Sequence, residues 1–165
     1  PEQLSPPSPC AGWSIREVMN HSIGVTHKRA DFAAGRTDQP HPPAGISLAS
    51  TITRRFARPR PPRKQRGDQS TTRLCHLPFG TFPADVAAGI NLLDVLAQTW
   101  DIAAAANIGI NDDDEEVWTI GFDAARGHRT RSRPSHYAPA VPAPMQASPM
   151  VLFLAFLGRT VGGYP

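Results

Sequence analysis

The chain has 165 residues and a mass of 17.8 kDa, a length that suits one domain with a single hydrophobic core. Its two cysteines, Cys10 and Cys75, have no Cys-x-x-Cys spacing, which excludes a disulfide framework and a zinc ribbon. The longest apolar stretch, residues 150–157, is far shorter than the ~20 residues of a membrane span, and no secretory signal opens the chain. Composition therefore predicts a soluble protein of the reducing cytoplasm, and the first residue, Pro1, predicts a processed or truncated chain.

The net charge of +3 comes from one segment. Residues 54–66 include seven bases and no acid, whereas acids outnumber bases in the rest of the chain. A basic block can contact phosphates, so nucleic acid is one candidate partner. However, the block has no aromatic residue after Phe56 and no helical period, features that favour a solvated loop. We expect residues 36–72 to form a disordered, basic and proline-rich segment, and nucleic-acid binding is the weaker alternative.

The first predicted helix runs from Ser14 to about Ala34. Ser14 and Glu17 have the spacing of a capping box, in which each side chain satisfies a backbone amide of the first turn. Apolar residues then recur at helical spacing: Ile15, Val18, Met19, Val25 and Phe32. His21 has this same spacing, so we expect it to lie along the apolar stripe.

A short extended piece is predicted over residues 74–82, with a turn at Gly80. A long helix follows, beginning near Thr81 or Pro83 and ending at Asn107. Its apolar residues go most of the way round, so we expect a central and heavily buried helix: Val86, Ile90, Leu92, Leu93, Leu96, Trp100 and Ile102.

Four polar residues of this helix share one stripe: Asn91, Asp94, Gln98 and Asp101. Polar groups on a buried helix must be paired, hydrated or bound to a ligand. Together with His21, the stripe is compatible with a zinc site between helices or with a satisfied polar network. Asp101 itself could bond a ligand or a bound water, cap backbone, or pair with an arginine.

The last third of the chain predicts two more helices. One runs from Asn111 to Gly127, and its acidic start complements the helix dipole. A proline-rich connector follows over residues 128–147. The final helix has Ser148 as its N-cap and Pro149 in its first turn. The expected fold is therefore all-α, with one short extended segment and proline-rich loops.

Several motifs of the chain are similar to those of one known family. The segment from Ser8 to His21, which contains Pro-Cys-Ala-Gly-Trp and Asn-His, resembles the opening of the mycothiol-dependent maleylpyruvate isomerase N-terminal domain family. This family belongs to the DinB-like superfamily. Residues 77–84 and 94–101 look like its middle signature. Residues 147–159 look like the last helix of an actinobacterial branch that is described only as metal-binding.

The resemblance implies a single DinB-like domain over residues 1–165, built as a four-helix bundle of the up-down-down-up type. It also implies one divalent metal, commonly zinc, on three side chains, whose positions here are His21, Asp94 and Gln98. Gln98 is a much weaker zinc donor than the imidazole that the family places there, so the expected site is degenerate.

Family members use mycothiol, so a small-molecule thiol is the expected partner, and metal-dependent thiol transferase or isomerase activity is the candidate chemistry. The alternative is a metal-free, non-catalytic remnant or binding module of the same fold.

Two departures from the family pattern predict an incomplete bundle. The family's helix before the Pro-Cys-x-Gly-Trp turn has no counterpart in this sequence. Residues 51–72 replace another helix, and we interpret them as a degenerate or frame-shifted segment. Cys10 lies in the turn motif, where we expect it to pack rather than react.

Overall fold

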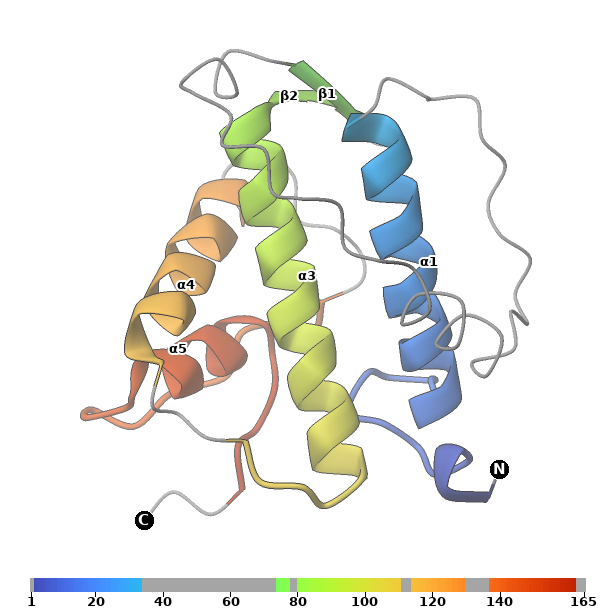
Figure 1. Cartoon of the computed structure of the whole chain (residues 1–165). Coiled ribbons are helices and arrows are strands. Elements are labelled where there is room, and N and C mark those ends of the chain that lie inside the picture. Colours follow the sequence, from blue (N-terminus) through green and yellow to red (C-terminus); the bar gives the residue numbers. More distant parts are fainter. Residues whose placement is uncertain (1, 34–73, 78–79, 111–113, 130–136, 163–165) are drawn as a thin grey trace. The chain divides into compact units, whose positions relative to one another are not determined.

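The computed structural model of the chain describes residues 2–33, 74–77, 80–110, 114–129 and 137–162, which are coloured in Figure 1. Its elements are η1 (Glu2–Leu4), α1 (Ile15–Ala33), β1 (Leu74–Leu77), β2 (Gly80–Pro83), α3 (Ala84–Ala105), α4 (Glu115–Arg129) and α5 (Pro149–Phe156). The described part is thus mostly helical with one small sheet, which corrects the expected all-α class. The predicted disordered segment at 36–72 lies outside the described residues.

Two compact units make up the chain. The first consists of Pro1–Val18 and Ala88–Pro165, and it holds most of α3 together with α4 and α5. The second, Met19–Ala87, holds most of α1 and both strands. The single domain over residues 1–165 stays a prediction. No helix among the described residues is long and apolar enough to cross a membrane.

The capping box at the start of α1 is confirmed. The backbone N–H of Ser14 donates to Oε2 of Glu17 at 2.7 Å, and the N–H of Glu17 donates to Oγ of Ser14 at 3.4 Å. The Ser14 hydroxyl also donates to Oε2, at 2.7 Å. The backbone and hydroxyl hydrogen bonds from Ser14 lower the pKa of Glu17, because they favour its charged form.

Strands β1 and β2 pair antiparallel, where the sequence predicted one extended piece. The register places Leu74 opposite Pro83 and His76 opposite Thr81. Nδ1 of His76 and Oγ1 of Thr81 lie 2.9 Å apart across this pair. Each strand has only four residues, too few for an alternating pattern to reveal two strands in the sequence.

The core of the first unit gathers around α5. Phe153 and Leu154 are fully buried there. The ring centroids of Trp118, on α4, and Phe153 lie 5.7 Å apart. Helix α3 contributes the buried residues Leu93 and Ala97 to this core. Helix α3 is nevertheless less buried than predicted, because Val95 on its opposite side is 43% exposed.

Helix α5 begins as the sequence predicted. Ser148 is its N-cap, and its Oγ accepts a hydrogen bond from the N–H of Val151 at 3.4 Å. Pro149 occupies the first turn, where its missing N–H costs nothing. The helix ends at Phe156, and Gly158 follows with a φ of +81°.

We expect Ser148→Ala to lower the free energy of unfolding by about 1 kcal/mol, because an amide of the first turn loses its acceptor. Chemical denaturation of the full chain measures this change. The matched control is Thr119→Ala, at an exposed position inside α4, which we expect to change stability by less than about 0.5 kcal/mol. An equal effect of both substitutions would contradict the capping role of Ser148.

Candidate functional site

The polar stripe predicted for α3 is buried at Asp101 and partly buried at its other three positions. None of its four residues is exposed, and Asp101 is only 1% exposed. By contrast, Val95 and Thr99, which lie between stripe residues, are exposed. The stripe therefore needs partners inside the protein, as its burial requires.

Asp101 finds its partner in Arg159, a few residues after α5. Nε of Arg159 donates to Oδ1 of Asp101 at 3.2 Å, and Nη2 donates to Oδ2 at 2.8 Å. A third donor, Nη1, binds the carbonyl oxygen of Leu157 at 2.9 Å. Of the roles considered for Asp101, the structure shows pairing with an arginine, in the two-bond geometry that suits a carboxylate.

Burial and pairing act on Arg159 in opposite directions. Burial by itself would lower the pKa of the guanidinium, but the hydrogen bond and charge of Asp101 outweigh it, so the pKa is raised. Both side chains are almost wholly removed from water, with 7% of Arg159 and 1% of Asp101 exposed. Each charge therefore depends on the other for its compensation.

Tyr137 joins Asp94 to this pair. Its hydroxyl donates to Oδ1 of Asp94 at 2.7 Å, and the guanidinium carbon of Arg159 lies 5.3 Å from the centre of its ring. Asp94, Tyr137, Arg159 and Asp101 thus form one connected set, which we call the polar network. It joins α3 to the segment before α5 and to the segment after it.

Asn91, at the start of the stripe, differs from the other members. Among the described residues its buried Oδ1 accepts no hydrogen bond. A buried acceptor without a donor costs free energy, so this position is one where a water or ligand group would be stabilised.

The three side chains implied as metal ligands are not equally placed. Asp94 and Gln98 lie one turn apart on α3, in the first unit, whereas His21 lies on α1, in the second. His21 is exposed, which corrects the expectation that it lies along the apolar stripe. That expectation rested on spacing from Val18 and Val25, and spacing alone does not decide whether a neighbouring element covers the position.

The donor chemistry does not fit a standard zinc site. No group of three or more His, Cys, Asp or Glu side chains that could hold a metal occurs in the part of the chain that the structure describes. Gln98 offers only a neutral amide. Zinc prefers imidazole, thiolate and carboxylate donors.

Cys10 has the features of a structural thiol. Burial raises its pKa, and the charge of Asp101 adds to the effect, while Arg159 acts in the opposite direction. A thiol with a raised pKa is protonated at neutral pH and a poor nucleophile. This agrees with the packing role expected from the sequence.

Two members of the polar network, Tyr137 and Arg159, were missed by the sequence analysis. Arg159 had a detectable signal, because a buried carboxylate such as Asp101 requires a basic partner and Arg159 follows an apolar helix. Tyr137 lies in the proline-rich connector and has no periodic pattern around it, so nothing in the sequence connects it with Asp94.

Comparison with known proteins adds evidence from the whole chain. Residues 1–76 match the model of the family described as Mycothiol maleylpyruvate isomerase N-terminal domain. Two similar proteins from Mycobacterium tuberculosis are Uncharacterized protein MT0763 (strain CDC 1551 / Oshkosh) and Uncharacterized protein Rv0738 (strain ATCC 25618 / H37Rv). Each is 32% identical over 168 residues, covering 97% of this chain and 87% of the relative. No solved structure matches the chain.

Proposed function

Because the chain belongs to the mycothiol maleylpyruvate isomerase N-terminal domain family, we propose that it is a DinB-like helical protein, related to mycothiol-dependent enzymes, whose divalent-metal site has degenerated. One observation supports this most strongly. Gln98, at the position where the family places an imidazole, offers only a neutral amide to a metal.

The donor set explains why metal affinity would be low. A zinc ion gains most from anionic or imidazole donors, and Gln98 is neither. The hydrogen bond from Tyr137 to Asp94 is compatible with metal ligation by that carboxylate, so the low affinity is expected from Gln98 alone. We therefore expect weak zinc binding and no efficient metal-dependent turnover of a mycothiol substrate.

A second function is favoured by the polar network itself. Asp94 and Asp101 both have hydrogen-bond partners supplied by the chain, and Asp101 has its counter-charge in Arg159. This suits a metal-free binding module of the same fold. The two proposals differ in whether His21 and Asp94 still form the remains of a metal site.

Restoring the missing imidazole tests the proposal. We expect Gln98→His to bind zinc about 100-fold more tightly than the parent chain, because a strong donor replaces a weak one beside Asp94. Isothermal titration calorimetry of chelator-treated protein with zinc measures both affinities and needs no enzymatic substrate.

Two further variants make the result specific. In His21→Ala/Gln98→His the gain should be lost, whereas Thr99→His, at an exposed neighbouring position on α3, should leave the parent affinity unchanged. If the parent and Gln98→His both bind zinc tightly, the site is not degenerate. If neither binds zinc measurably, the metal-free module is the better description.

A further inference from the structure

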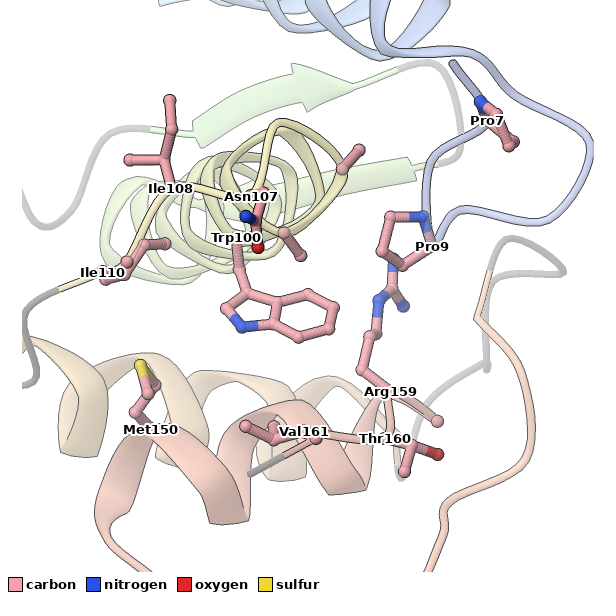
Figure 2. Close-up of a pocket in the computed structure, with 15 residues that line it drawn as sticks. Pro7, Pro9, Trp100, Asn107, Ile108, Ile110, Met150, Arg159, Thr160 and Val161 are labelled. Carbon is pink, nitrogen blue, oxygen red and sulfur yellow. The ribbon is translucent and has the colours of Figure 1, made fainter. Parts of the chain in front are cut away.

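The first unit contains a pocket of about 820 Å³ between the C-terminal end of α3 and the segment that follows α5 (Figure 2). Its volume lies within the ~300–1,000 Å³ typical of small-molecule sites. None of the implied metal ligands lines it, so it is independent of the function proposed above.

Apolar side chains line one side of this pocket, and polar atoms make up the larger share of its remaining surface. Figure 2 shows the indole ring of Trp100 in the middle of the lining side chains, facing Met150 and Val161, with Ile110 beside it. The side chain of Ile108 is 63% exposed and also lines the pocket. An aromatic face next to aliphatic side chains suits a flat, apolar ligand, because stacking adds to the burial of apolar surface.

Charge narrows the class of ligand. The lining includes a single charged side chain, Arg159, and its charge is balanced by the two hydrogen bonds with Asp101. An anion would gain little from a guanidinium that is already paired, and it would face the negative end of the α3 dipole near Ala105. A cation would find no acidic side chain among the lining residues to compensate its charge.

Neutral polar groups complete the lining. Asn107 and Thr160 are both exposed residues of the pocket, and their side chains can exchange hydrogen bonds with a hydroxyl or carbonyl group. We propose that this pocket binds a small, uncharged aromatic molecule that carries one such polar group, with its ring against Trp100.

Three probes with the same ring test this proposal: naphthol, naphthoate and naphthylmethylammonium, which are neutral, anionic and cationic at neutral pH. Each is titrated calorimetrically into the full chain. We expect naphthol to bind about tenfold more tightly than either charged probe, because only the charged probes lose hydration without gaining a counter-charge.

A pair of matched variants locates the binding. Ala104→Phe fills the pocket from an exposed position on α3 and should weaken naphthol binding about tenfold, whereas Ala106→Phe, exposed but outside the lining, should not. Circular dichroism establishes that both variants are folded. If Ala104→Phe is not, Thr160→Trp at the other side of the pocket replaces it. Absence of naphthol binding, tighter binding of a charged probe, or equal binding by the filled and control variants would overturn the proposal.

Discussion

Asp101→Ala is expected to lower the free energy of unfolding by about 3–5 kcal/mol, because it leaves the guanidinium of Arg159 buried without its counter-charge. Of the oxygen atoms that accept hydrogen bonds from Arg159 in the parent structure, only the carbonyl oxygen of Leu157 would remain. Its side chain is 7% exposed, so water cannot readily replace the lost carboxylate. Urea denaturation of the parent and variant measures the difference.

Two controls separate this effect from the loss of a charge as such. Asp123→Ala removes an exposed aspartate of α4 and should change stability by less than about 0.5 kcal/mol. The double variant Asp101→Leu/Arg159→Met replaces both charges with apolar side chains and should recover most of the loss, because a buried pair is often no more stable than a hydrophobic one. A double variant as unstable as Asp101→Ala would show that the pair has a different role.

Gly158→Ala is expected to cost about 2–4 kcal/mol, the sum of a left-handed backbone and a steric overlap. Gly158 has a φ of +81°, a region that residues with a Cβ rarely adopt. A Cβ here would lie 2.7 Å from the carbonyl oxygen of Pro139 and 2.8 Å from that of Ala138. These are backbone atoms, so they cannot move aside as a flexible side chain can. Thermal unfolding measures the loss.

The matched control for this substitution is Gly127→Ala. Gly127 lies in α4, where a Cβ would meet no atom within 4 Å. Alanine is the better helix former, so this variant should be as stable as the parent or up to about 1 kcal/mol more stable. Similar losses of stability in both variants would contradict the close approach of Gly158 to the carbonyl oxygens of Ala138 and Pro139.

Local sequence signals were sufficient for most helix boundaries. The capping box of Ser14 and Glu17 and the Ser148-Pro149 start of α5 were both predicted, because each depends on residues within one turn. The chain also leaves the helical conformation after α3 at Asn107, as predicted, because Asn107 has a φ of +54°. These features are decided by the backbone donors that each helix end leaves unpaired.

Contacts between distant residues could not be predicted in the same way. Asp101 and Arg159 are 58 positions apart, and Asp94 and Tyr137 are 43 apart. The polar stripe showed that partners were required, but only the fold determines which side chains supply them. For the same reason, the sequence predicted only a proline-rich connector around Tyr137. In the structure, the backbone N–H of Val141 in this connector donates to the carbonyl oxygen of Ala155 in α5 at 2.9 Å.

At the candidate site, the family resemblance indicates which positions would bind a metal, but the chemistry of the residues at those positions decides whether they can. The motifs predicted Asp94 and Gln98 as neighbours on one helix, and the structure places them one turn apart on α3. The same motifs could not predict that Tyr137 hydrogen-bonds Asp94. The amide at position 98 is the physical basis for proposing a degenerate site.

The most direct test of this account is a pair of thermal melts, followed by far-UV circular dichroism, of the chelator-treated parent chain with and without added zinc. A ligand stabilises the folded state appreciably only when its concentration is well above its dissociation constant. We predict one cooperative transition at the same temperature in both samples, since Gln98 is a poor zinc donor and the site should bind the ion only weakly. A transition that becomes cooperative only with zinc, or that zinc moves upward by several degrees, would contradict the degenerate site.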